Sequence, residues 1–192
     1  MLAKHFSHMF YAPKQSLSDA DREPAKWLDI IIHVAVLSLI PTVCTYIASV
    51  HIGWNFGVTE LFLVPSDKAL TISIATFVLL NLGVYAIGYG ICWLAQTFDV
   101  KPKAIHCIEL AAFTSVPLFA AGFIALYPVL YINVLVGMLA LMASVYLLYT
   151  GVPIFMHIPE EEGFVYSTWV VTLGLVMLVS MIGGSIFFMN LL

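Results

Sequence analysis

The sequence predicts an all-α polytopic membrane protein, a bundle of five transmembrane helices. Hydrophobic residues make up 62% of the 192 residues and charged residues only 9%, whereas soluble domains average about 25% charged residues. The chain also contains five apolar stretches, each long enough to supply the roughly 20 residues that cross a bilayer core. This composition leaves no room for a separate soluble domain.

The charge balance limits the class of partner. The formal net charge is −4, and the basic residues are dispersed along the chain rather than clustered, so nucleic acid is not an expected partner. We expect membrane lipids, further copies of the chain or other membrane proteins instead.

Residues 1–26 form a polar segment ahead of the apolar stretches, with no signal-peptide pattern, so we expect it to be retained on the cytoplasmic side. Its apolar residues share one helical face, which predicts a short helix in the headgroup layer, with a disordered tail as the alternative. Pro13 is expected to end this helix and residues 16–24 to be a linker. The apolar residues are Leu2, Phe6, Met9 and Phe10.

The first span is predicted over residues 27–50, with Trp27 at the membrane boundary, where indole rings concentrate. Pro41 is expected to kink this span. The loop that follows, residues 51–68, contains several aromatic residues and is expected to dip into the interface.

The second span is predicted over residues 69–97. Asn81 falls in its middle and needs a hydrogen-bond partner, because lipid offers none. Ala86 and Gly90 have the small-xxx-small spacing that allows two helices to approach closely.

The third and fourth spans are predicted over residues 104–126 and 129–152. Tyr127 and Pro128 turn the chain directly from one into the other, so the two helices are expected to be antiparallel neighbours. The third span carries most of the unusual residues and is predicted to be the centre of the bundle.

Pro117 interrupts the third span. It is expected to act as a kink whose freed carbonyl is bonded by the hydroxyls of Thr114 and Ser115, with a gating role as the alternative.

The fifth span is predicted over residues 166–192 and contains no ionisable residue. It is expected to be a packing element.

Basic residues orient the bundle. Six of the seven lie on one side of the predicted spans, and only Lys68 lies on the other, which predicts a cytoplasmic N-terminus and a periplasmic C-terminus. The six are Lys4, Lys14, Arg22, Lys26, Lys101 and Lys103.

Four polar residues form the candidate site. Asp29 and His33 lie one turn apart at the start of the first span, and His106 and Glu109 lie one turn apart at the start of the third. If these spans face each other, the four side chains would pass a proton or hold a divalent ion. The competing interpretation is structural, because groups near a helix end reach the interface or neighbouring basic residues.

The three cysteines fall inside apolar stretches and are interpreted as small buried hydrophobic residues. They are Cys44, Cys92 and Cys107.

Several blocks resemble the Yip (Ypt-interacting protein) family, and more closely its bacterial inner-membrane branch. The resemblance implies five spans, a cytoplasmic N-terminus and an inner-membrane location, and for eukaryotic members roles in vesicle traffic through lipidated small GTPases. It supplies no catalytic residues; Pro117 and the turn at Tyr127 and Pro128 look like structural family positions. The blocks are IGWNFG (52–57), AIHC (104–107), VPLFAAGFIALYP (116–128) and LLYTGVPIFMHIPEEEGF (147–164).

The sequence contains no nucleophile elbow, phosphate-binding loop or paired catalytic carboxylates, so an enzyme, a cofactor and a resident metal are not expected. The leading hypothesis is a scaffold or accessory protein that self-associates or binds lipid or membrane partners. The alternative is a small transporter or channel for an ion, metal or small solute.

Overall fold

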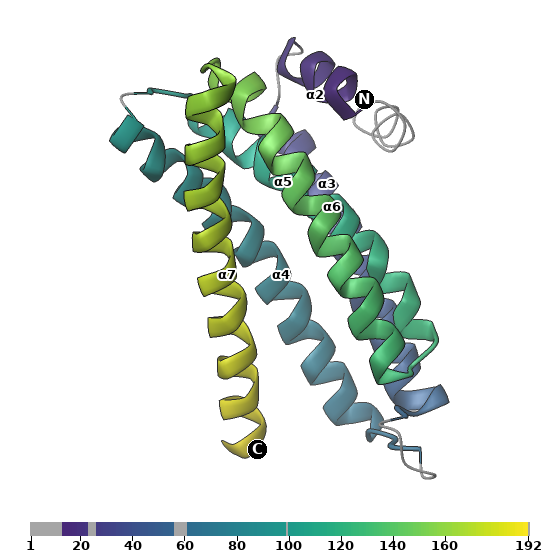
Figure 1. The fold of residues 1–192 in the computed structure, drawn as a ribbon. Helices are drawn as coiled ribbons and strands as arrows, with labels where there is room; N and C mark the ends of the chain where they lie inside the picture. Colours follow the sequence, from purple (N-terminus) through teal and green to yellow (C-terminus); the bar gives the residue numbers. More distant parts are fainter. Residues whose placement is uncertain (1–12, 23–25, 56–60, 99, 192) are drawn as a thin grey trace.

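The computed structural model is a helical bundle (Figure 1), and it describes residues 13–22, 26–55, 61–98 and 100–191. Short 3-10 or π-helical turns extend α3, α4 and α5 at their C-terminal ends. The long helices and turns are α2 (Pro13–Arg22), α3 (Trp27–Ile47), η1 (Ala48–Ile52), α4 (Ser66–Ala95), η2 (Gln96–Phe98), α5 (Ala104–Ala121), η3 (Gly122–Leu126), α6 (Leu130–Met156) and α7 (Glu160–Leu191).

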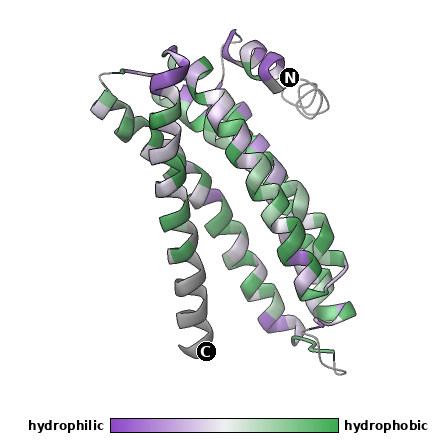
Figure 2. Ribbon diagram, in the orientation of Figure 1, coloured by the Kyte–Doolittle hydropathy of each residue, from purple (hydrophilic) through white to green (hydrophobic). Residues whose placement is uncertain are grey.

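The all-helical fold class is confirmed. Four helices in the described part of the chain are long and apolar enough to cross a membrane: Trp27–Ile52, Ser66–Phe98, Ala104–Leu126 and Leu130–Met156. Hydrophobic residues dominate their middle sections, whereas α2 and the end of the bundle beside it carry many hydrophilic residues (Figure 2). Helix α7 is 32 residues long, but the count of five crossing helices stays a prediction.

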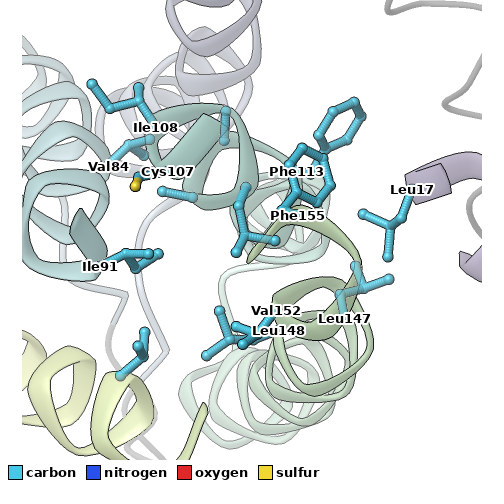
Figure 3. Packing of buried hydrophobic residues seen from close by; sticks show 14 of the residues in the cluster. Leu17, Val84, Ile91, Cys107, Ile108, Phe113, Leu147, Leu148, Val152 and Phe155 are labelled. Carbon is cyan, nitrogen blue, oxygen red and sulfur yellow. The ribbon is translucent and has the colours of Figure 1, made fainter. Parts of the chain in front are cut away.

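Helix α5 lies at the centre of the bundle, as the sequence predicted. Its most apolar window is 67% buried, against 33% or less for the other three candidate spans, because α3, α4 and α6 all pack against it. Figure 3 shows the core that results, in which side chains from α2, α4, α5 and α6 meet. Its members include Leu17, Val84, Ile91, Cys107, Ile108, Phe113, Leu147, Leu148, Val152 and Phe155.

Helix α2 corrects the interpretation of the N-terminal segment. Pro13 is the first residue of α2, and the predicted linker is helical up to Arg22; proline suits a first helical turn because its missing N–H needs no partner there. Leu17 is fully buried and lies close to Gly151 of α6. The helix predicted over residues 2–10 lies outside the described residues.

Two side-chain contacts accompany this docking of α2. His157 Nε2 lies 3.2 Å from Asp21 Oδ2, and Lys14 Nζ lies 3.9 Å from Glu160 Oε1. Both partners of α2 lie where α6 ends and α7 begins, so α2 covers that end of the bundle.

The two prolines inside α3 and α5, Pro41 and Pro117, have different surroundings. Helix α3 continues through Pro41, which packs so tightly against Gly122 that a Cβ atom at Gly122 would lie 2.5 Å from the Pro41 Cβ. In α5 the hydroxyls of Thr114 and Ser115 donate to the carbonyl of Ala111, at 3.1 and 2.7 Å.

The predicted acceptor of those two hydroxyls was therefore wrong. Pro117 removes the amide that would bond to Phe113, four residues earlier, and neither hydroxyl bonds to that carbonyl. Both return to the preceding turn instead, as serine and threonine commonly do in apolar helices.

The turn at Tyr127 and Pro128 is also held by the loop between α3 and α4. The Asn55 amide donates to the Pro128 carbonyl at 2.9 Å, and the Leu130 amide donates to the Asn55 carbonyl at 3.1 Å. The Asn133 side chain donates to the Tyr127 carbonyl at 2.8 Å. The connection therefore forms a small hydrogen-bonded cap on the end of the bundle away from α2.

Asn81 has the partner that its position requires. Its Nδ2 donates to Ser38 Oγ of α3 and to the Phe77 carbonyl of its own helix, both at 2.8 Å. Both amide protons are thus used, and one of these bonds joins α4 to α3.

Helix α4 approaches α5 closely at a glycine that the sequence did not single out. A Cβ atom at Gly88 would lie 2.8 Å from the Ile108 Cα of α5, whereas Gly90, of the predicted pair, lies against Leu173 of α7. Ala86, its predicted companion, is exposed.

Candidate polar site on helices α3 and α5

The candidate site depends on whether α3 and α5 touch, which the sequence left open. They do: Ile30, Val34 and Leu37 of α3 belong to the same buried cluster as the α5 residues. The rings of His33 and Phe113 lie with their centroids 6.2 Å apart. The two helices that carry the candidate residues are therefore neighbours.

Asp29 and His33 share a helical face by spacing but have different surroundings. Asp29 lies in the first turn of α3 and is exposed. At this position the positive end of the helix dipole stabilises a carboxylate. His33 is half-buried, and its Nε2 is enclosed without a hydrogen-bond partner among the described residues. The exposed carboxylate fits the structural interpretation; the enclosed imidazole nitrogen fits it less well.

His106 and Glu109 also differ in burial. His106 is half-buried at the entry of α5, where its backbone amide donates to the Lys103 carbonyl at 3.0 Å. Glu109 is only 6% exposed and stands within an unbroken buried run of α5, from Cys107 to Pro117. A carboxyl group in such a position is costly to ionise unless it is paired or hydrogen-bonded.

Imidazole and carboxyl groups in such positions can bind or pass a proton. No group of three His, Cys, Asp or Glu side chains in the described part of the chain is placed to hold a metal ion. Of the four candidates, His33 and Glu109 are the enclosed polar groups and Asp29 is the exposed one.

A small cavity lies between α3 and α4, away from the candidate residues. Its volume is about 30 Å³, which is enough for about one water molecule. Two of its hydroxyls are already bonded within their helices, Thr42 to the Ser38 carbonyl and Thr76 to the Ile72 carbonyl, each at 2.8 Å. The lining residues are Thr42, Thr45, Ser49, Val64, Ala69, Ile72, Ser73 and Thr76.

Two of the three cysteines are bonded to each other. Cys92 of α4 and Cys107 of α5 form a disulfide with their Cα atoms 5.7 Å apart, so interpreting them as simple buried hydrophobic residues was wrong. Cys44 is buried and free, as that interpretation expects. The available signal was the position of the two residues on either side of the short 96–103 connection.

Tyr166 is a second residue whose role the sequence did not reveal. It is fully buried, its hydroxyl donates to the Ile91 carbonyl of α4, and its ring meets Phe98 edge-on at 5.1 Å. The predicted packing helix is thus anchored to α4 by a specific polar contact.

The comparisons with known proteins agree with the resemblance seen in the sequence. Residues 7–181 match the Yip1 domain. This chain belongs to the Yip1 family. The Yip1-family chain is 34% identical to the inner membrane protein YohC of Escherichia coli K12 over 146 residues, which cover 76% of this chain and 75% of that protein.

YohC of Escherichia coli O6:H1 gives the same identity and coverage. No solved structure matches the chain. Family membership together with the apolar helices identifies this Yip1-family chain as a membrane protein.

Proposed function

We propose that this Yip1-family chain is a non-enzymatic protein of the bacterial inner membrane. It serves as a scaffold or accessory protein that self-associates or binds lipids or other membrane proteins. The observation that carries the proposal is the distribution of polar and apolar groups. Glu109, Thr114 and Ser115 of α5 are buried at the centre of the bundle, whereas the outer faces of α4 and α6 present large apolar side chains.

The apolar outer faces are suited to lipid or to another membrane helix. A Cβ atom at Gly137 of α6, or at Gly174 of α7, would have nothing within 4 Å, so these positions are open to close approach by a further helix. Exposed side chains on α4 and α6 include Leu70, Ile74, Val78, Leu82, Leu135, Met138, Leu139 and Met142.

The proposed orientation places α2 in the cytoplasm and the C-terminus in the periplasm. It is supported by the basic residues and by the course of α7, which runs from the end of the bundle near α2 to the opposite end (Figure 1). In a variant without the three native cysteines, cysteines at position 15 and at the C-terminus should react with an impermeant maleimide from opposite sides. Labelling of both from one side would refute the fifth crossing.

The native mass of the protein, released gently from its own membrane, tests the scaffold proposal. We expect a homo-oligomer, or a complex with retained lipid or a second membrane protein. A monomer stripped of lipid and partner under the same conditions would contradict the proposal. Gly137→Leu is the variant of choice for a second measurement, because it fills an open position on the surface: its self-association should weaken while its fold persists.

One observation favours the alternative of a small transporter or channel. Glu109 is buried at 6% exposure beside a helix that carries His33, whose Nε2 is enclosed. If these groups move protons with a solute, Glu109→Gln will insert normally yet abolish a pH-dependent flux in proteoliposomes, whereas Asp29→Asn will not. Absence of flux of protons, common divalent metals and small solutes through the unmodified protein would remove this alternative.

A further inference from the structure

The disulfide between Cys92 and Cys107 joins two helices that are consecutive in the chain. Cys92 lies in the last turn of α4 and Cys107 in the first turn of α5, 15 residues apart. The bond therefore closes the connection between them, at the end of the bundle that also carries α2.

The two cysteine residues differ in exposure. Cys107 is fully buried, whereas Cys92 is only partly buried. A reagent that approaches the pair from outside therefore meets Cys92 first. Because thiol–disulfide exchange depends on which sulfur can be reached, this difference assigns separate roles to the two residues.

Whether a disulfide persists or is reduced depends on the cellular compartment that it faces. The connection between the cysteines contains Lys101 and Lys103, and in the proposed orientation it lies at the cytoplasmic surface. The cytoplasm keeps thiols reduced, so disulfides there are transient and respond to oxidants.

We propose that Cys92 and Cys107 form a reversible thiol–disulfide site, oxidised by peroxides and reduced by small or protein dithiols of the cytoplasm. The site rests on the proposed orientation of the bundle and on no other part of the proposed function.

Oxidation proceeds in two steps that balance. The Cys92 thiolate attacks one oxygen of hydrogen peroxide, the O–O bond breaks, and the departing hydroxide takes a proton to become water. Cys92 is then a sulfenic acid. The Cys107 sulfur attacks the Cys92 sulfur and displaces the oxygen as a second water, which carries the Cys107 proton. The two sulfurs lose two electrons in all, and the peroxide gains them.

Reduction uses the same accessible sulfur. A thiolate of the dithiol attacks Cys92, and Cys107 leaves as a thiolate that takes a proton. The second thiol of the reductant then attacks the mixed disulfide, closes the reductant's own disulfide and releases Cys92 as a thiol.

The bond acts on three helices. Ile91, next to Cys92, accepts the hydroxyl of Tyr166 from α7, and Ile108, next to Cys107, lies against Gly88 of α4. Oxidation therefore fixes the ends of α4 and α5 at the point where α7 is also attached. Reduction removes this covalent link between α4 and α5, and the Tyr166 hydrogen bond does not replace it, because it joins α7 to α4.

The redox state is measured by labelling cysteines with a mass-tagged maleimide in denaturant, after rapid acid quenching of intact cells that express the full chain. The protein has three cysteines, of which Cys44 is free in the oxidised form. We expect three labels in resting cells, one after hydrogen peroxide, and three again after dithiothreitol. Cys44→Ser is the matched control and should give two, none and two.

Two outcomes would overturn the site. Three labels under every condition would show that the pair does not form the bond. One label in resting cells would show a permanent bond. In that case, impermeant labelling of a cysteine at position 15 separates the causes: labelling from outside means that the proposed orientation is wrong, and protection means that only the reversibility is wrong.

Thermal unfolding in detergent gives an independent measurement. The oxidised protein should unfold about 5 °C or more above the reduced protein, because the bond restricts the unfolded chain. Cys92→Ser and Cys107→Ser should each remove the difference between oxidising and reducing buffer, and Cys44→Ser should retain it. Equal unfolding temperatures for the two states of the unmodified protein would contradict a restraining role.

Discussion

Helices α5 and α6 are almost equally apolar, yet α5 is mostly buried and α6 is mostly exposed. Their most apolar windows have mean hydropathies of 1.8 and 2.0, but 67% of the first is buried and only 17% of the second. In water the more apolar helix would be the inner one. In a membrane, lipid solvates apolar side chains as well as protein does, so small and polar residues identify the inner helix instead.

The residues of α5 show this directly. Ala111, Ala112, Thr114 and Ser115 are all buried, and their short side chains allow three helices to pack around one. The exposed face of α6 carries long side chains, among them Met138 and Met142. Apolarity alone therefore does not distinguish the centre of this bundle from its periphery.

The largest loss of stability is expected from a substitution at the contact between α4 and α5. Gly88→Ala places a Cβ atom 2.8 Å from the Ile108 Cα, so the two backbones must separate. We expect a loss of about 2 to 3 kcal/mol in unfolding free energy, measured by titration with SDS in mixed micelles. Gly137→Ala on the open face of α6 is the matched control, and it should be neutral or up to about 1 kcal/mol more stable, since alanine favours a helix. Equal losses at both positions would mean that α4 and α5 do not approach as described.

A smaller effect is expected for the polar anchor of α7. Tyr166→Phe keeps the buried ring and removes only the hydroxyl that donates to the Ile91 carbonyl, so we expect a loss of about 1 kcal/mol by the same measurement. Tyr146→Phe, on the exposed face of α6, should change the unfolding free energy by less than about 0.5 kcal/mol. Equal changes in unfolding free energy for the two variants would show that the hydrogen bond of Tyr166 does not stabilise the bundle.

The smallest change in stability is expected at Ser115, where two substitutions test whether the size of the side chain or its hydroxyl matters. The Ser115 hydroxyl bonds to the Ala111 carbonyl of its own helix, a carbonyl that the helix ladder also uses. Ser115→Ala should therefore change stability by less than about 0.5 kcal/mol, whereas Ser115→Leu should cost about 2 kcal/mol or more by overpacking. The reverse order would show that the hydroxyl, and not its small size, places this residue at the centre.

Much of the fold was predictable from local signals. The helical class, the central place of α5, the turn at Tyr127 and Pro128 and the need of Asn81 for a partner all follow from residues acting within one helix or one turn. Helix α2 was interpreted as a linker because its residues are mostly polar, and its docking depends on Leu17 beside Gly151, a contact distant in sequence.

The candidate site was predictable only as a set of residues. The spacing of His106 and Glu109 says that they lie one turn apart, but it does not say that Glu109 faces the core while Asp29 faces outward. The disulfide and the contact of Gly88 with Ile108 depend on how α4 rotates about its axis relative to α5. That rotation is set by the packing of all the helices, and no periodicity within one apolar stretch reports it.

The exchange of hydrogen bonds between Asn55 and the residues around Pro128 has a consequence for biosynthesis. As the chain leaves the ribosome, α3 and α4 are made before α5 and α6, and Asn55 in their connecting loop lacks its partners until Leu130 has been made. The first hairpin therefore enters the membrane with an incomplete loop, and arrival of the turn between α5 and α6 completes it. Separately expressed fragments divided between α4 and α5 would have to find each other before either could finish folding.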